Sequence, residues 1–426
     1  MLVPRSAGRR AALGPAVLAM GLLAGCGSSG DDDAGSAGGP VDAVTPSAGP
    51  AVAFDDLRPA GAGGAETTDF PLVAGPGTTV LVPQSSGVSL VVSAVDYTSG
   101  ETAWQRELPG TDPAGYLGCR TTPDAATAFC LAHTAADENR LLTLDAATGE
   151  VRSDVPVAAG LLDAVTDSGV VVRDRSIDPD RASSVDPATG EIRWSLDLDD
   201  AAGIPVVQHE DVLFFGELPE GEADQSTVMV TADTGATIAE FSGRVTVQGD
   251  TALRADEAAG LVAAVGPDGS DRWQLTGAAG PECRVGSAPS GVVFLQHDGG
   301  LTAVDPADGT IRWSRPAAAA EQVIPLLDSV LAPDAEGNLY LVDPGTGETL
   351  GAVYLDGDVV ATPPCGSPHL LVASRSGVTA HSGTGGWPAW EVTHPPGWSA
   401  EEAEFLLTDG ATVVRSESGF YALISD

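Results

Sequence analysis

The histidines are the first residues to consider for chemistry, because imidazole acts as an acid, a base or a metal ligand near neutral pH. The chain has six: His133, His209, His297, His369, His381 and His394. No two are spaced by two or four residues, so no strand or helix would present a pair of them on one face. The sequence also lacks the GxSxG, Walker A, HExxH and EF-hand patterns. We therefore expect neither a catalytic group nor a metal site from these residues.

The cysteines could form disulfides or bind zinc. Apart from Cys26, which belongs to the N-terminal segment, four remain: Cys119, Cys130, Cys283 and Cys365. The N-terminal segment described below predicts that the chain is exported, and an even number of cysteines in an exported chain predicts disulfides. Cys119 and Cys130 lie on two runs joined by a short loop, so we expect a cross-bridge between them. Cys283 and Cys365 are either a second disulfide or two buried thiols. No CxxC or Cys–His spacing of the zinc type occurs.

Aspartates recur before a glycine at a fixed spacing. The stretch Ser184–Leu198 reads SVDPATGEIRWSLDL, and Ala303–Arg315 reads AVDPADGTIRWSR. An Asp at the start of such a segment accepts N–H bonds inside a type I turn. Gly190 and Gly309 supply the positive φ with which the next strand restarts. These aspartates are therefore predicted to cap turns rather than to act as catalytic acids.

The pattern is a repeat. Its copies begin at Asp96, Asp145, Asp186, Asp233, Gly266, Asp305, Asp343 and Ser382. The seven steps from first to last average about 41 residues, a period typical of propeller blades. Five copies place a tryptophan after the turn, where its ring could wedge between neighbouring sheets: Trp104, Trp194, Trp273, Trp313 and Trp390.

Three short alternating runs precede each turn and one run follows it. Four antiparallel strands per unit, with no helical period, predict an all-β toroid of four-stranded sheets. A ninth unit, Glu404–Ser425, stops before its fourth strand, and Val52–Leu57 could supply that strand from the other end of the domain.

The repeat resembles the tryptophan-docking motif A-x-D-x-x-T-G-x-x-x-W of the pyrroloquinoline-quinone (PQQ)-like β-propellers. The match is strongest at Asp186–Trp194 and Asp305–Trp313 and covers about residues 68–426. The resemblance implies eight blades, although nine partial units can be counted. The family includes quinoprotein dehydrogenases and outer-membrane assembly scaffolds, so the resemblance is more specific for fold than for function.

The N-terminus is predicted to be a targeting segment. Residues 1–25 combine three arginines with a short apolar run, as in a signal peptide. Leu23–Cys26 reads LAGC, which resembles a bacterial lipobox and implies lipid, including palmitate, on Cys26. Residues 26–50 are rich in Gly, Ser and Asp and predict a tether, followed by the propeller over 51–426. We expect the protein at the extracytoplasmic side of the cell membrane, exported by the Sec or the Tat route.

The net charge of the chain limits the classes of partner that it could bind. With 60 acidic residues against 20 arginines, the formal charge is −40, which excludes nucleic acid as a partner. We expect a monomeric, non-catalytic scaffold that binds a protein, peptide or envelope ligand on one propeller face, and the polar segment Glu217–Gln225 is an expected partner loop. The alternative is an oxidoreductase with PQQ and Ca²⁺ in the channel. In the quinoprotein enzymes a disulfide between adjacent cysteines contacts the quinone, and this sequence has no such pair.

Overall fold

The computed structural model divides the chain into two compact units, Met1–Asp42 and Ala43–Asp426. All the residues that the structure describes lie in the second unit. They are residues 47–48, 52–53, 72–85, 90–108, 111–134, 138–158, 160–174, 177, 179–198, 206–217, 225–256, 258–279, 291–297, 300–316, 324–325, 329–334, 338–353, 370–374, 377–381, 388–395, 404–407, 411–416 and 419–424. Cys26, Cys283 and Cys365 lie outside them, so the predictions for these three residues stay predictions.

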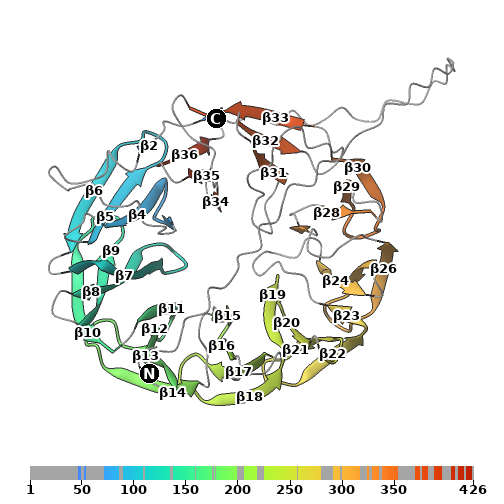
Figure 1. Ribbon diagram of the computed structural model, residues 1–426, viewed down its shortest axis with the longest axis horizontal. Coiled ribbons are helices and arrows are strands. Elements are labelled where there is room, and N and C mark those ends of the chain that lie inside the picture. The colour runs from blue at the N-terminus through green and yellow to red at the C-terminus, as the bar shows by residue number, and fades with distance from the viewer. Residues whose placement is uncertain are drawn as a thin grey trace, which may run out of the picture. The chain divides into compact units, whose positions relative to one another are not determined.

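The second unit is an all-β propeller, as predicted. Within the described ranges the strands form nine sheets, or blades, arranged around a common centre, and there is no α-helix (Figure 1). The first four blades consist of β3 (Val73–Ala74), β4 (Thr79–Ser85), β5 (Leu90–Asp96) and β6 (Thr102–Leu108); β7 (Thr111–Thr121), β8 (Thr127–Thr134), β9 (Asn139–Asp145) and β10 (Val151–Val157); β11 (Leu161–Thr166), β12 (Gly169–Asp174), β13 (Asp180–Val185) and β14 (Ile192–Leu198); and β15 (Val207–His209), β16 (Val212–Glu217), β17 (Ser226–Thr231) and β18 (Thr237–Ser242).

The remaining five blades follow the same order. Blades 5 to 7 consist of β19 (Arg244–Gln248), β20 (Thr251–Asp256), β21 (Leu261–Val265) and β22 (Asp271–Thr276); β23 (Ala278–Ala279), β24 (Val293–His297), β25 (Gly300–Val304) and β26 (Ile311–Pro316); and β27 (Ile324–Pro325), β28 (Val330–Pro333), β29 (Leu339–Val342) and β30 (Thr349–Ala352). Blades 8 and 9 consist of β31 (Leu370–Ala373), β32 (Gly377–His381) and β33 (Pro388–Thr393); and β34 (Glu404–Leu407), β35 (Ala411–Ser416) and β36 (Gly419–Ile424) with the N-terminal strands β1 (Ser47–Ala48) and β2 (Val52–Ala53).

The blade number corrects one expectation. We expected eight blades with one irregular unit absorbed, whereas all nine countable units form sheets. The ninth sheet is completed from the N-terminal side of the unit: Val52 pairs with Phe420, and Ser47 pairs with Ile424. Val80 and Val82 of blade 1 share a core cluster with Phe420 of blade 9, so apolar packing also closes the ring. The predicted use of a strand near Val52 is confirmed.

The turns before the outer strands have the expected geometry. In blade 3 the Gly190 N–H donates to the Asp186 carbonyl (2.8 Å), and Gly190 has a φ of +76°. The Asp186 carboxylate accepts the N–H groups of Ala188 (2.8 Å) and Thr189 (3.2 Å). The register then shifts by one residue, so that Trp194 lies opposite Ser184. Such a bulge re-aims the side chains that follow it, and here it places the ring against the next blade.

Four tryptophans dock on the following blade in the same way. The Trp194 indole N–H donates to the Ala232 carbonyl of blade 4 (2.9 Å), and a Cβ on Gly235 would lie 2.5 Å from the ring. The equivalent donor and carbonyl pairs are Trp104 with Ala146 (3.1 Å), Trp273 with Pro306 (2.9 Å) and Trp313 with Pro344 (3.0 Å). Each ring therefore packs on a glycine that could not carry a side chain there. Trp390 lies on β33, opposite Ala380.

In two blades a small residue takes the tryptophan position, and the residue opposite it on the neighbouring strand is larger. The residue opposite each docked ring is small: Ala94, Ser184, Ala264 and Ala303. Where Ser153 and Ala239 take the tryptophan position, the opposite residues are the larger Thr143 and Met229. The Ser153 hydroxyl still donates to the Pro187 carbonyl of the next blade (2.5 Å). The inter-blade contact is thus kept while its side chains change.

The blade 4 turn requires a correction in register. Gly235 N–H donates to the Thr231 carbonyl (2.9 Å), and Thr231 N–H donates to the Ala236 carbonyl (3.0 Å), which places Thr231 where the other copies have Asp. Asp233, which we expected in that role, lies two residues further along and is exposed. The Thr231 and Thr234 hydroxyls are hydrogen-bonded to each other (2.5 Å). Threonine, another turn-forming residue, therefore occupies the position in this copy.

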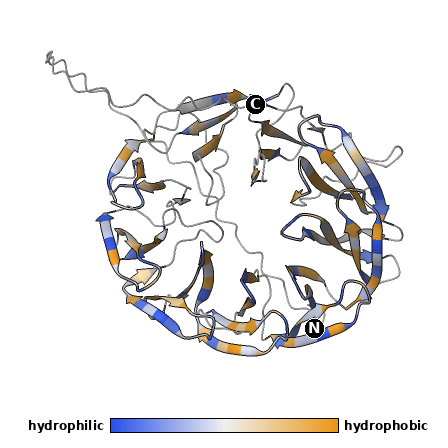
Figure 2. Cartoon of the chain, turned by 180° about the vertical axis from the view of Figure 1, so that it is seen from behind, coloured by the Kyte–Doolittle hydropathy of each residue, from blue (hydrophilic) through white to orange (hydrophobic). Residues whose placement is uncertain are grey.

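Apolar residues concentrate on the middle strands, and polar and apolar residues alternate on the outer ones (Figure 2). Val171, Leu213 and Val230, for example, are buried together between blades 3 and 4. Burial of such strands stabilises by roughly 25 cal/mol per Å² of apolar surface. No helix in the described residues is long and apolar enough to cross a membrane.

Candidate functional site

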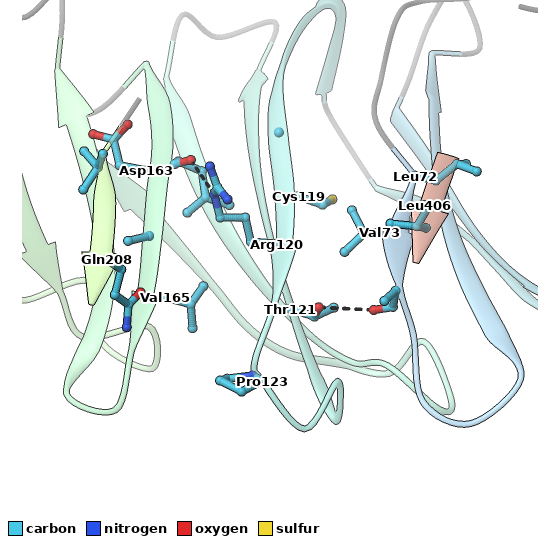
Figure 3. A pocket seen from close by; sticks show the side chains of 15 residues that line it. Leu72, Val73, Cys119, Arg120, Thr121, Pro123, Asp163, Val165, Gln208 and Leu406 are labelled. Atoms are coloured by element: carbon cyan, nitrogen blue, oxygen red, sulfur yellow. Dashed lines mark hydrogen bonds between the residues drawn. The ribbon is translucent and has the colours of Figure 1, made fainter. Parts of the chain in front are cut away.

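A cavity of about 860 Å³ opens on the inner strands of the ring. Its wall is formed by residues of β34, β3, β7, β11 and β15 and is mostly apolar. Figure 3 labels four of the larger apolar side chains, Leu72, Val73, Val165 and Leu406. Leu162 and Val206 also line the cavity. We call this cavity the inner-wall pocket. An apolar wall with a few polar groups is the usual composition of a ligand site.

Two adjacent residues of β7 link this strand to the inner strands on either side of it, β3 and β11. The Thr121 hydroxyl donates to the Ala74 carbonyl at the end of β3 (3.2 Å). The Arg120 Nε–H donates to the Leu162 carbonyl on β11 (3.0 Å). Successive side chains of a strand point to opposite faces, which is why 120 and 121 reach different blades (Figure 3). Arg120 remains exposed in the pocket.

Asp163 is the acidic residue of the pocket wall, and a buried arginine neutralises it. It lies at a register shift of β11, between Leu162 and Ala164. Arg173 of β12 donates from Nε to one carboxylate oxygen and from Nη2 to the other, both at 2.8 Å. The Arg173 and Asp163 side chains are 2% and 7% exposed. Both oxygens of Asp163 are thus engaged, and the charge of Arg120 is not balanced by it.

The predicted Cys119–Cys130 disulfide is confirmed. The two residues are direct partners in the register of β7 and β8, and their Cα atoms are 4.2 Å apart. Both are buried in the cluster between blades 1 and 2, with Leu81 and Leu142 among their neighbours. The bond therefore fixes β7, which carries Arg120 and Thr121, to the rest of its blade.

The repeat aspartates are occupied by turn contacts on the outside of the blades. The hydrogen bond from Arg193 lowers the pKa of Asp186, and the N–H of Ala188 lowers it further. Asp305 and Asp145 pair in the same way with Arg312 and Arg152, the former at 2.7 Å. The pKa of Asp343 is lowered by the Thr346 N–H. Burial raises the pKa of Asp96, but hydrogen bonds led by the Thr78 hydroxyl lower it more. These groups are held as anions.

The histidines are dispersed. His209 lies on β15, His297 on β24 and His381 on β32, whereas His394 contacts Tyr421 of blade 9 (2.8 Å). In the described ranges no three His, Cys, Asp or Glu side chains come together as a group that could hold a metal ion.

Three polar residues of the pocket were not expected from the sequence, namely Arg120, Asp163 and Gln208, and neither was Arg173, which bonds to Asp163. One signal could have found two of them. Asp163 interrupts the apolar run LLDAV, and Arg173 follows the apolar run VVV ten residues later. Opposite charges inside neighbouring apolar strands predict a buried ion pair. Arg120 and Gln208 carry no comparable pattern.

The geometry defines a tryptophan-docking β-propeller with a pocket on its inner wall. A family model described as "Outer membrane protein assembly factor BamB" matches residues 88–352. That match covers more than half of the 426 residues, and the chain belongs to this family.

Several solved structures are similar. BamB from Moraxella catarrhalis is 15% identical, with a TM-score of 0.47, over 84% of this chain and 98% of that one. Quinohemoprotein alcohol dehydrogenase from Comamonas testosteroni is 12% identical, with a TM-score of 0.44, over 84% and 74% of the two chains. The C-terminal WD40 domain of Sif2 is 10% identical, with a TM-score of 0.47, over 84% and 97%. No curated protein matches the chain at a significant level.

The pocket residues do not fit a quinone held over Ca²⁺. That arrangement needs carboxylate ligands for the metal, and Asp163 has both oxygens bonded to Arg173. It also needs a disulfide between adjacent cysteines, whereas Cys119 bonds to Cys130 on the next strand.

Proposed function

We propose that this protein is a lipid-anchored, non-catalytic scaffold that binds a protein partner on its propeller at the extracytoplasmic side of the membrane. The observation that carries the proposal is the family match over residues 88–352, since the family is described as an assembly factor for outer membrane proteins. An assembly factor acts on other proteins, so a protein is the expected partner.

The chemistry of the repeat aspartates supports a binding role. A general acid or base works best with a pKa near the operating pH. Hydrogen bonds lower the pKa values of Asp145, Asp186 and Asp305, and each carboxylate is tied to an arginine and to its own turn. These side chains build a rigid frame, and rigid frames present binding loops at little entropic cost.

The anchor is tested by Cys26→Ala in the full chain. Without the thiol no lipid can be attached, so we expect the variant to leave the membrane fraction and to keep the unfolding temperature of the wild type. Recovery of folded Cys26→Ala with the membranes would contradict the anchor.

The partner is tested by affinity purification of the full chain from detergent-solubilised membranes, followed by mass spectrometry. The matched variant replaces residues 218–224 by Gly and Ser at the same length. We expect one protein in stoichiometric amount with the wild type and its loss with the variant. If no protein co-purifies in stoichiometric amount, and the chain instead gains visible absorbance with PQQ and Ca²⁺, the oxidoreductase alternative replaces the scaffold.

A further inference from the structure

We propose that the inner-wall pocket binds a small organic carboxylate with an apolar body, and that Arg120 is the residue that selects the carboxylate. This binding site is separate from the protein partner proposed above.

Most polar side chains of the pocket are occupied by the protein itself. The Thr121 hydroxyl donates to the Ala74 carbonyl. Both carboxylate oxygens of Asp163 accept hydrogen bonds from Arg173, from Nε and Nη2. Arg120 uses its Nε–H on the Leu162 carbonyl. Its two Nη groups make no hydrogen bond or ion pair with the described part of the chain. The same is true of the side-chain amide of Gln208, which is exposed on β15.

Arg120 is therefore the uncompensated charge of the pocket wall. An arginine side chain carries a full positive charge. A ligand that fills the pocket removes water from Arg120 and must supply an anion, because a desolvated charge without a partner is strongly unfavourable. The Nε–H bond to β11 fixes the plane of the guanidinium, so the Nη edge is oriented before a ligand arrives. Pre-orientation of this kind reduces the entropy lost on binding.

The form of the anion follows from charge and geometry. The planar Nη edge matches the two oxygens of a carboxylate. A phosphate monoester would match too, but it carries close to two charges at neutral pH. In a chain with a formal charge of −40 the dianion meets more repulsion than the monoanion. We therefore assign a carboxylate.

The body of the ligand follows from the rest of the wall. Leu72, Val73, Val165, Val206 and Leu406 offer apolar surface, and a volume of about 860 Å³ lies in the range usual for small-molecule sites. A peptide would bury several backbone amide groups, each of which needs a partner. Among the lining side chains that are not engaged, Gln208 is the one amide. An aliphatic or aromatic body fits this wall better than a peptide does.

The test compares three soluble probes of one shape: phenylbutyrate, phenylbutanol and phenylbutylammonium. Binding to the full chain is measured by calorimetry or saturation-transfer NMR. We expect phenylbutyrate to bind at least about tenfold more tightly than either other probe. Equal affinities for the three, or no saturable binding of phenylbutyrate, would overturn the proposal without any variant being made.

Variants then locate the site. Arg120→Gln should reduce phenylbutyrate binding to the level of phenylbutanol. The matched control is Arg181→Gln, which changes the net charge equally but lies in an exposed ion pair with Asp197; it should bind as the wild type does. Val165→Phe keeps Arg120 and fills the pocket, so all three probes should bind more weakly. An affinity for phenylbutyrate that survives both Arg120→Gln and Val165→Phe would contradict the site.

Two further probes distinguish the competing ligands. Phenylbutyl phosphate that binds more tightly than phenylbutyrate would overturn the choice of a carboxylate. An apolar tetrapeptide with a free C-terminus that binds more tightly, and depends on Arg120, would overturn the choice of a small molecule. Weaker binding of both supports the assignment.

Discussion

Arg173 and Asp163 face each other across adjacent strands of blade 3 and are joined by two hydrogen bonds of 2.8 Å. The carboxylate comes from the register shift of β11, where the inner strand departs from regular pairing. Because Asp163 is anchored from behind by β12, the Leu162 carbonyl beside it is held in place to accept the Nε–H of Arg120. The buried pair thus supports the side of the pocket on which Arg120 lies.

Breaking this pair should destabilise the protein strongly. Asp163→Asn removes the carboxylate that accepts two hydrogen bonds from Arg173, in a pair whose side chains are 2% and 7% exposed, and should cost about 3–5 kcal/mol. Arg173→Met removes both hydrogen bonds from the buried Asp163 carboxylate and should destabilise the protein as much. The double variant Asp163→Leu/Arg173→Met removes both charges and should recover most of the loss. Urea unfolding of the four proteins measures this; single variants within about 1 kcal/mol of the wild type would contradict the role of the pair.

Gly235→Ala tests the docking of Trp194. The added Cβ would lie 2.5 Å from the ring, and Gly235 has a φ of +64°, so two separate penalties apply. Gly260→Ala is the control, because Gly260 has a similar φ of +58° and a Cβ there would meet nothing within 4 Å.

Both variants should lose about 1 kcal/mol from backbone strain, and Gly235→Ala should lose a further 1–3 kcal/mol, roughly, from overpacking. The measurement is the free energy of unfolding in urea. In the background of Trp194→Ala the two glycine substitutions should become equal. Equal losses already in the wild-type background would mean that the ring does not need the glycine.

Acid should weaken the turns. Hydrogen bonds lower the folded-state pKa values of Asp186 and Asp305 below the unfolded value of about 3.9. Their contribution is therefore complete above about pH 4 and is lost as the pH falls further, through the folded-state values. When the pH is lowered below 4, we expect the urea concentration at the unfolding midpoint of the wild type to decrease. The decrease should be smaller when Asp186 and Asp305 are both replaced by Asn. A double variant with the full wild-type slope would contradict this account.

The blades were predictable from sequence because their signals are local. A turn aspartate, a glycine of positive φ and a tryptophan a few residues later fix one hairpin and its bulge. Asp233 shows where such signals fail: the segment TADTG offers Thr231 and Asp233 as alternative starts, and the backbone hydrogen bonds select Thr231. The number of blades follows the local units, since all nine countable units form sheets, and the expectation of eight came from the family resemblance.

The pocket was not predictable for a related reason. Its residues come from five inner strands that are far apart in the chain, and none of them belongs to the repeated motif. Arg120 and Thr121 lie in GCRTT, where nothing indicates that Arg120 reaches β11 and Thr121 reaches β3. That information arises only when the ring has formed.

His394 links the last two blades and should make their contact sensitive to pH. Its Nε2 lies 2.7 Å from the Ser374 carbonyl, which requires a proton on Nε2, so Nδ1 accepts the Tyr421 hydroxyl (2.8 Å) when the ring is neutral. Burial lowers the pKa of His394, and the bond to Ser374 opposes this in part. Because the pKa is lower in the folded protein, this stability is complete above the unfolded value of about 6.5 and is lost as the pH falls through the folded-state value.

We therefore expect the wild type to unfold at lower urea at pH 5.5 than at pH 8, a range above that in which the aspartates titrate. His394→Gln should flatten the dependence, because glutamine cannot acquire the charge. His209→Gln, on β15, leaves the contacts with Tyr421 and Ser374 intact and should retain the wild-type slope. If His394→Gln keeps that slope while His209→Gln loses it, the pH dependence arises at the inner wall and not at the junction of blades 8 and 9.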